Sequence, residues 1–271
     1  MDVRFWGVRG SIPVSGETFV RTGGNTSCLE LCQDGERLIL DGGTGLCALG
    51  DSLGSPARVA ILFSHVHWDH IQGVPFFGPA FHPDSQLTFM GTPRSSGRLR
   101  DALAAQMRPP TFPITLEALR ARMQFVDLPP LEAREHGPFR ITPLDLPHPD
   151  GVSGFRIEAG GRSLVYATDV EHGEGLRPEL IRLAEGADLL VHDAQYSRDE
   201  YLGKTGFSRV GWGHSPWEDA VEVARLADVG QLRLFHHDPR RNDSGVDSIE
   251  AQARVLFPRL RAAREGEVVR L

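Results

Sequence analysis

The chain has 271 residues, of which 40% are hydrophobic and 24% are charged, and its formal net charge is −7. This size fits one globular α/β domain, and the acidic charge argues against a general nucleic-acid binder. No segment reaches ~18 uninterrupted apolar residues, and no basic segment followed by an apolar one opens the chain. We therefore expect neither a membrane span nor a signal peptide.

Short apolar runs bounded by small or polar residues predict strands. They lie at 3–6, 27–31, 37–40, 59–63, 86–90, 123–126, 139–144, 154–157, 163–167, 188–191 and 232–235. Helical spacing is found at 94–107, 116–123, 216–226 and 248–256. The third of these helices has Ser215 as the expected N-cap, Pro216 at its first position and Glu218 three residues after the cap.

Strands outnumber the predicted helices, and several strands follow one another directly. This pattern predicts an α/β sandwich with mixed sheets, formed by a single domain of residues 1–271. The segment at about 73–138 contains many prolines and its own helical patterns. We interpret it as an insertion that forms a lid or rim, with a peripheral packing subdomain as the alternative.

The three cysteines, Cys28, Cys32 and Cys47, are odd in number and lack CxxC spacing. This arrangement is typical of free thiols in a reducing compartment and not of a disulfide framework or a zinc knuckle. We therefore expect a cytoplasmic protein.

The run His65-Val66-His67-Trp68-Asp69-His70 directly follows the predicted strand at 59–63. Residues two apart in an extended segment point to the same side, so His65 and His67 can share one ion. Asp69 and His70, farther along, can face a second ion. Imidazole and carboxylate groups suit Zn²⁺, and also Mn²⁺ or Fe²⁺.

Three more candidate ligands, His148, Asp169 and His236, each lie just after a predicted strand. In open α/β sheets, sites assemble at the carboxyl ends of strands. These side chains can therefore converge with the histidine run into a two-ion site.

With these motifs the chain resembles the metallo-β-lactamase superfamily over nearly its whole length. The run 65–70 is similar to the superfamily signature, and His148, Asp169 and His236 match its remaining ligand motifs in order. The Gly-rich segments 7–11, 23–27 and 40–45 resemble the phosphodiesterase branch. That branch includes phosphoribosyl cyclic phosphodiesterases and transfer-RNA 3′-processing enzymes. The resemblance implies an αββα sandwich of two mixed β-sheets flanked by helices.

The resemblance also implies a ligand set. The first ion would be held by His65, His67 and His148. The second would be held by Asp69, His70 and His236, with Asp169 bridging the two. Asp41 would lie behind the ligand loop and orient a ligand histidine, although a simple turn residue in Asp41-Gly42-Gly43 is the alternative. At the adjacent pair His236 and His237, the strand pattern favours His236 as the ligand.

Two ions that share a water can lower its pKa, and the bridging hydroxide would attack phosphorus. The leaving alkoxide still needs a proton. The segments 192–195 and 211–215 resemble the His-Glu-Ala-Thr and Gly-His-Ser motifs of the RNA-processing branch. This implies that His214 is the general acid, held by Asp193, which replaces the longer Glu of that branch. The alternative for His214 is a residue that satisfies backbone groups at a helix entry.

We expect Asp69 to take part in catalysis as well as in metal binding. Arg9 and Asn25, in the N-terminal Gly-rich loops, and His237 are further candidates for contact with substrate.

The favoured function is therefore a two-metal phosphodiesterase that acts on a small cyclic or short-chain anionic phosphodiester, with Zn²⁺ as the first choice of metal. RNA 3′ processing is an alternative, but only residues 149–168 separate His148 from Asp169, where that branch commonly carries a long basic arm. A long nucleic acid is thus not expected as a partner. A thioester, lactone or β-lactam hydrolase, and a metal-binding protein without activity, also remain open. Homodimers are common in the resembled branch, but no segment here marks an interface.

Overall fold

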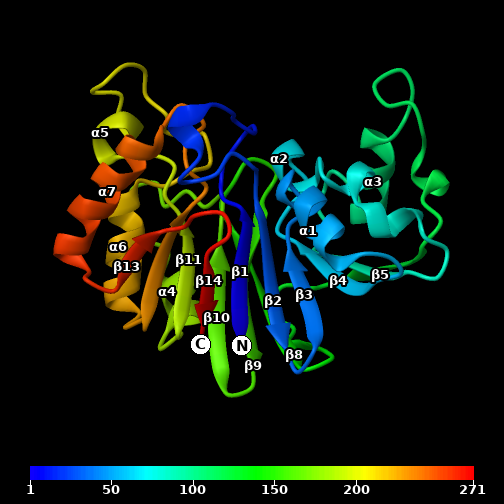
Figure 1. Ribbon diagram of the computed structural model, residues 1–271. Helices are drawn as coiled ribbons and strands as arrows, with labels where there is room; N and C mark the ends of the chain where they lie inside the picture. The colour runs from blue at the N-terminus through cyan, green and yellow to red at the C-terminus, as the bar shows by residue number, and fades with distance from the viewer.

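The computed structural model describes all residues, 1–271, and contains two seven-stranded sheets packed face to face (Figure 1). Helices cover the outer face of each sheet, and the two termini lie side by side at one end of the sandwich (Figure 1). This αββα layering confirms the predicted fold class.

The first sheet combines antiparallel strands near the termini with a parallel run of four strands. In spatial order its strands are β14 (Val268–Arg270), β1 (Asp2–Gly7), β2 (Cys28–Gln33), β3 (Glu36–Leu40), β4 (Arg58–Phe63), β5 (Gln86–Gly91) and β6 (Arg122–Asp127). Strand β4 is apolar and buried from Val59 to Phe63 because both of its faces are covered.

The second sheet also joins an antiparallel part to a parallel part. Its strands in spatial order are β13 (Leu260–Ala262), β12 (Gln231–Phe235), β11 (Leu189–Asp193), β10 (Arg162–Ala167), β9 (Val152–Ala159), β8 (Phe139–Leu146) and β7 (Arg134–His136). The parallel strands of both sheets end at the same end of the sandwich, opposite the chain termini (Figure 1).

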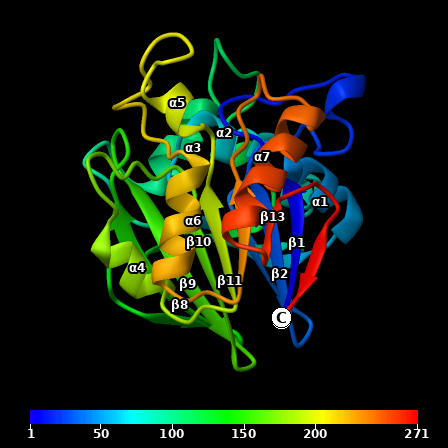
Figure 2. The same ribbon diagram turned by 90° about the vertical axis from the view of Figure 1, so that its left-hand side faces the viewer.

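Two groups of helices form the outer layers (Figures 1 and 2). The first sheet is covered by α1 (Gly45–Leu53), α2 (Trp68–Ile71), α3 (Leu99–Gln106) and the short 3₁₀ turns η2 (Val74–Phe76), η3 (Gly78–Phe81) and η4 (Leu116–Ala118). The second sheet is covered by α4 (Pro178–Ala184), α6 (Trp217–Leu226) and α7 (Asp243–Leu256), whereas α5 (Arg198–Tyr201) lies at the end of the sandwich and η1 (Glu17–Phe19) lies against α7.

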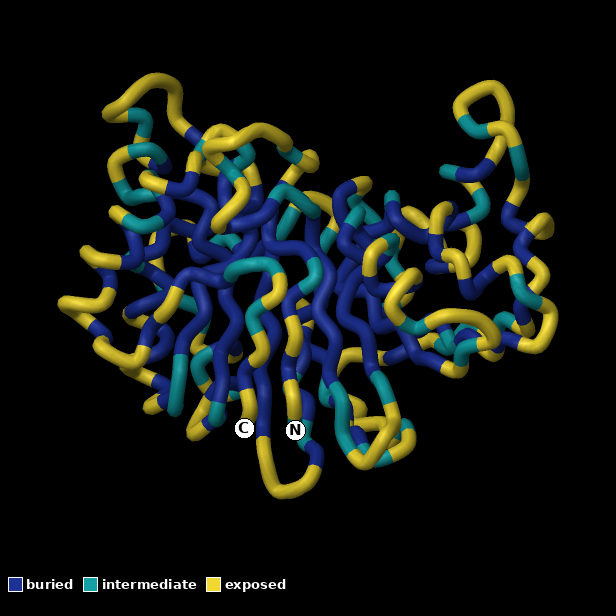
Figure 3. Tube along the Cα trace, in the orientation of Figure 1, coloured by how far each residue is buried: buried dark blue, intermediate teal, exposed yellow.

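The core has three layers that follow from this arrangement. Between the sheets, side chains such as Phe5, Leu31, Phe155 and Tyr166 are fully buried. A second cluster lies between the second sheet and α4, α6 and α7, and a third lies between the first sheet and α1, η2, η3 and α3. The strands are therefore buried along most of their length, while exposed residues gather in the connecting loops (Figure 3).

All the predicted strands are present, with ends shifted by up to two residues, but the predicted helices need correction. The predicted helix at 116–123 is a single 3₁₀ turn followed by β6, because pairing with β5 takes residues from Arg122 onward into the sheet. Helix α3 begins only at Leu99. Helix α7 begins at Asp243, where the Asn242 side chain caps it by accepting the N–H of Gly245 at 3.0 Å.

Ser215 is not the cap of α6. Its hydroxyl donates to the carbonyl oxygen of Val170 at 2.5 Å, and Pro216 is the residue that precedes the helix. The structure also contains elements that the sequence pattern does not predict: α1, α4, α5 and the short edge strands β7, β13 and β14. These elements are too short or too weakly patterned to stand out by periodicity.

Residues 73–138, interpreted above as a lid or rim insertion, supply β5 and β6 to the first sheet and β7 to the second. The rest of the segment, including α3, lies at the outer edge of the molecule (Figure 1). A lid function for that outer part stays a prediction. The three cysteines are free thiols. None of the helices combines the length and the apolar character that a bilayer crossing needs.

Candidate metal centre

The candidate ligands lie at the end of the sandwich where the parallel strands end, and His148 reaches it from β8 in the antiparallel part of the second sheet. His65 and His67 follow β4, and His148 follows β8. Asp169 and His236 follow β10 and β12. Asp41, Asp169 and His236 adopt left-handed backbone angles, with φ of 60°, 53° and 59°. Such angles are uncommon outside glycine and cluster at functional sites, because the surrounding fold must hold them.

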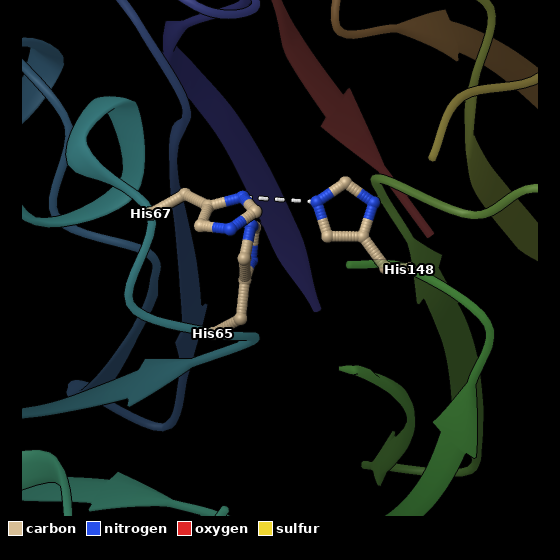
Figure 4. Close-up of side chains that lie close together, drawn as sticks. All are labelled: His65, His67 and His148. Atoms are coloured by element: carbon tan, nitrogen blue, oxygen red, sulfur yellow. Dashed lines mark hydrogen bonds between the residues drawn. The ribbon is translucent and has the colours of Figure 1, made fainter. Parts of the chain in front are cut away.

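His65, His67 and His148 form one group (Figure 4). His67 Nδ1 and His148 Nε2 are 2.9 Å apart, and the ring centroids of His65 and His148 are 4.9 Å apart. His148 Nδ1 donates to the carbonyl oxygen of Gly213 at 2.8 Å, so the lone pair of the neutral ring is on Nε2. His65 Nε2 is buried without a hydrogen-bond partner.

Asp69, His70, Asp169 and His236 form a second group, and all four are buried. The Nε2 atoms of His70 and His236 are 3.3 Å apart. His70 Nδ1 donates to Asp41 Oδ2 at 2.8 Å, and His236 Nδ1 donates to Gln195 Oε1 at 2.8 Å. Both outer nitrogens are thus occupied as donors, and the inner nitrogens face each other.

Asp169 lies between the two groups. Its Oδ1 is 3.2 Å from the Nε2 atoms of both His70 and His236. Its Oδ2 is 3.7 Å from His65 Nε2 and 3.8 Å from His148 Nε2. One carboxylate oxygen therefore faces each group.

This donor set fits divalent cations. In each group, imidazole nitrogens of two histidines come within 3.3 Å of one another, and the carboxylate of Asp169 lies close to both groups, a cluster of donors that a divalent cation stabilises. Burial lowers the pKa of His65 and of His148, the latter to about 4. Both rings are then neutral near pH 7, and neutral imidazole is the form that binds a metal.

Asp41 supports the ligand loop from behind. Besides the bond from His70, its carboxylate accepts the main-chain N–H of Ser64 at 2.8 Å and the hydroxyl of Tyr166 at 2.8 Å. Asp41 thus joins β3, the ligand loop and the second sheet. The sequence motif indicated Asp41, but Tyr166 is an ordinary buried strand residue in the sequence, and no local pattern could have revealed its role.

The second support comes from residues near Asp69 and His236. The main-chain N–H of Ser11 donates to Asp69 Oδ2 at 2.7 Å. Gln195, which accepts from His236, lies in the segment 192–195 that the sequence analysis considered only for Asp193. Its position in that motif is the signal that could have identified it.

His214 and Asp193 are brought together beside the second group. His214 Nδ1 donates to Asp193 Oδ2 at 2.8 Å, and the His214 and His236 rings stack with centroids 4.9 Å apart. Burial alone would lower the pKa of His214, but the charge and hydrogen bond of Asp193 outweigh it and raise this pKa to about 9. Asp193 therefore favours the protonated form of His214, which suits the role of a proton donor.

Each of the three candidate substrate contacts has a hydrogen-bond partner within the protein, and a role in substrate binding stays a prediction for all three. Arg9 is fully buried, and its guanidinium donates to the carbonyl oxygens of Gly23 and Arg241 at 2.8 and 2.7 Å. The Asn25 amide donates to Glu265. His237 is buried, with Nε2 donating to the carbonyl oxygen of Ala263 at 3.0 Å. Arg9 and His237 are thus enclosed in the protein interior, because the N-terminal loops pack against the segment after β12, whereas Asn25 is half-buried.

Comparisons with known proteins agree with this fold. A family model described as the β-lactamase superfamily domain matches residues 37–237. The ribonuclease Z of Haloarcula marismortui is 24% identical, with 99% of this chain and 94% of that protein aligned. The ribonuclease Z of Gemmatimonas aurantiaca is 27% identical, with 99% and 95% aligned.

Two solved structures are similar over nearly their whole length. The metallo-β-lactamase fold protein YhfI from Bacillus subtilis has a TM-score of 0.72 and 22% identity, with 99% of this chain and 98% of that chain covered. A diphosphatase from the PhnP family has a TM-score of 0.74 and 16% identity, with 100% and 97% covered. At these identities the likeness is one of fold.

Proposed function

This chain belongs to the metallo-β-lactamase superfamily and is a metal-dependent hydrolase, and we propose that it cleaves a small phosphodiester with two bound metal ions. The observation that carries the proposal is the placement of a buried, hydrogen-bonded His214–Asp193 pair beside the two ligand groups. A phosphodiester with an alkoxide leaving group needs such a proton donor, whereas a thioester or an activated ester needs it less.

His65, His67 and His148 would hold one ion, and Asp69, His70 and His236 would hold the other. Asp169 would bridge them, because one of its oxygens faces each group. When bound, the two ions would supply an acidified water and offset the charge on the phosphoryl oxygens. We propose Zn²⁺ as the metal, because imidazole dominates the donor set and Zn²⁺ prefers it; Mn²⁺ and Fe²⁺ also accept these ligands.

The protein's own side chains would orient the ligand histidines and protonate the leaving oxygen. Asp41 and Gln195 hold His70 and His236 through their Nδ1 atoms, which directs both Nε2 lone pairs inward. Asp193 raises the pKa of His214 and so favours its charged form, and His214 would deliver its Nε2 proton to the leaving oxygen. Asp69 would contribute to catalysis as a ligand whose carboxylate is fixed by the N–H of Ser11.

A small substrate is supported by the cavities next to the ligand loop. One cavity of about 390 Å³ is lined by Ser64, His65 and Val66, and another of about 490 Å³ is lined by Trp68 and Gln72. Both volumes are typical of sites for small molecules. The first cavity contains two arginines, Arg94 and Arg98, but also Asp101 and Asp150, so it offers no surplus of positive charge for a polyanion.

RNA is the second candidate substrate, because relatives that align over nearly their whole length are named ribonuclease Z. This weakens the expectation that a long nucleic acid is excluded. Against RNA, the chain between His148 and Asp169 is almost filled by the β9–β10 hairpin, Val152–Ala159 and Arg162–Ala167. That connection leaves no room for an RNA-binding arm at this place.

Hydrolysis of bis-p-nitrophenyl phosphate by protein of known metal content, with and without added Zn²⁺ or Mn²⁺, tests the proposal. We expect turnover that requires metal, and then cleavage of nucleoside or ribosyl cyclic phosphates. Cleavage of a 3′-extended transfer RNA at a much higher kcat/KM would select the RNA candidate instead. Protein with two bound ions that cleaves a lactone or thioester but no phosphodiester would overturn the proposal.

A further inference from the structure

The segment 211–214, between α5 and α6, contacts the candidate ligand His148 and also contains the proton donor His214. The carbonyl oxygen of Gly213 accepts the Nδ1 proton of His148 at 2.8 Å. The next residue is His214, which carries the proposed catalytic proton. The position of this short segment therefore sets both the orientation of a proposed ligand and the position of the proton donor.

The segment has no regular secondary structure to hold it. Gly213 has a φ of 88°, and a Cβ atom there would lie 2.1 Å from His148 Nδ1, so no side chain can anchor the segment at this position. Trp212, just before it, is half-exposed. Apart from the contact of Trp212 with Phe207 and the bond between His214 and Asp193, an anchor must therefore come from another part of the chain.

Glu171 supplies this anchor. Its Oε1 accepts the main-chain N–H of Gly211 at 2.7 Å and the hydroxyl of Tyr201 at 2.5 Å. Its Oε2 accepts the main-chain N–H of Gly213 at 2.7 Å. Hydrogen bonds to a charged acceptor are about twice as strong as neutral ones. One carboxylate thus ties the segment to the end of α5 and holds both glycine amides.

The main chain around Glu171 extends this clamp to the other side of His148. The N–H of Glu171 donates to the carbonyl oxygen of Pro147 at 3.1 Å, and the carbonyl oxygen of Val170 accepts the hydroxyl of Ser215 at 2.5 Å. The three residues from Asp169 to Glu171 therefore contact the segments that carry His148 and His214, as well as supplying Asp169 itself.

We propose that Glu171 is a positioning residue of this hydrolase, which fixes the segment 211–214 and thereby aligns His148 and His214 with the reacting phosphodiester. This inference rests on the proposed function. Glu171 binds no metal and transfers no proton. It acts through the carbonyl oxygen of Gly213 and through the position of the His214 ring.

The test is Glu171→Gln, with Glu174→Gln as the matched control. The glutamine keeps the size of the side chain but places an NH₂ group against a main-chain N–H, so at least one of the two glycine contacts is lost. Glu174 is an exposed carboxylate in the loop that follows, so its replacement makes the same change of charge nearby.

For Glu171→Gln we expect kcat to fall roughly 10- to 100-fold on substrates with alkoxide leaving groups, and several-fold less on nitrophenyl esters, with KM little changed. In a His214→Ala background the extra sensitivity to the leaving group should disappear, because the two changes act on the same step. Unchanged kcat on both substrate types would overturn the inference, and equal slowing of both would overturn its claim that Glu171 positions His214.

Hydrogen exchange of the segment 206–214, followed by mass spectrometry on the metal-loaded protein, tests the anchor without any assay of activity. We expect faster exchange in Glu171→Gln than in the wild type and in Glu174→Gln. If the wild type cleaves no phosphodiester but this difference is seen, the proposed function fails and the anchor stands. If the three proteins exchange alike, the anchor fails whatever the substrate.

Discussion

His214 Nδ1 lies 2.8 Å from Asp193 Oδ2, and Asp193 Oδ1 accepts the main-chain N–H groups of Gln195 and Ser215 at 3.0 and 3.3 Å. Two backbone N–H groups thus fix the carboxylate through Oδ1, while Oδ2 accepts the hydrogen bond from the imidazole. Asp193 stands where the resembled motif has a glutamate, and the distance shows that the shorter side chain still reaches His214. This pair leads to the first two predictions.

Replacing His214 with alanine should separate substrates by their leaving group. We expect both metal ions to stay bound, because all seven proposed ligands remain. Hydrolysis of diesters with alkyl alcohol leaving groups should slow about 10²- to 10⁴-fold, the usual contribution of a general acid. Nitrophenyl esters, whose leaving group needs no proton, should slow far less. His82→Ala, at a surface loop, is the control, and equal slowing of both classes would rule out the general-acid role.

The pH dependence of the same reaction should follow the charge of His214. Its pKa is raised to about 9, so the protonated donor is present below that pH and is lost as the pH rises through it. We therefore expect the rate on alkyl diesters to fall on the alkaline side. Burial lowers the pKa of His214, and the negative charge of Asp193 raises it. Asp193→Asn removes that charge, so the pKa of His214 should fall and the rate should begin to decline at a lower pH.

Bound metal ions add positive charge near the ring and lower this pKa in both proteins, so the comparison is between wild type and variant at equal metal content. A pH–rate profile measured with each protein gives the two midpoints. A decline that stays at the same pH after Asp193→Asn would show that another group causes it.

Replacing Asp169 with alanine should remove metal and turnover together. The two Asp169 oxygens face different ligand groups, at 3.2 Å from His70 Nε2 and 3.7 Å from His65 Nε2. Loss of this carboxylate removes a negative charge from both proposed ion sites. We expect fewer than two ions per chain by elemental analysis, and a large loss of kcat. Asp199→Ala, at an exposed aspartate, is the control, and full occupancy in Asp169→Ala would contradict the bridging role.

Much of this site could be predicted from the sequence because its ligands follow strands. A strand reads as an apolar run, and the residue just after it is then placed at a known edge of the sheet, as for Asp169 after β10 and His236 after β12. The supporting contacts could not be predicted in this way. Tyr166 reaches Asp41 across the two sheets, 125 positions apart in the chain, and Glu171 binds main-chain groups that have no side-chain signal.

The burial of Arg9 could not be predicted either, for a different physical reason. A Gly-rich loop with an arginine is typical of a phosphate-binding loop, and the sequence analysis therefore considered Arg9 as a substrate contact. In the structure the same glycines let two loops pack closely: a Cβ atom at Gly7 would lie 1.8 Å from the carbonyl oxygen of Thr26. The close packing encloses Arg9 and directs its guanidinium to carbonyl oxygens. Local composition alone does not distinguish the two outcomes.

Replacing Arg9 with methionine should therefore lower stability and leave substrate affinity nearly unchanged. The guanidinium joins the N-terminal loop to the segment after β12 through the carbonyl oxygens of Gly23 and Arg241. Methionine keeps much of the volume but leaves these buried acceptors without donors. We expect the free energy of unfolding to fall by about 3 kcal/mol, measured by urea denaturation of the metal-loaded protein.

The comparison with Arg4→Met isolates burial from the loss of charge, because the Arg4 guanidinium lies on the exposed side of β1, over the ring of Trp6. For Arg4→Met, the free energy of unfolding should fall by well under half of the decrease expected for Arg9→Met. For Arg9→Met at a temperature where it is fully folded, KM for bis-p-nitrophenyl phosphate should stay within about twofold of the wild type, since a side chain that contacts no substrate makes no differential interaction with it. A KM raised tenfold with unchanged stability would restore Arg9 as a substrate contact and would mean that the N-terminal loop opens when substrate binds.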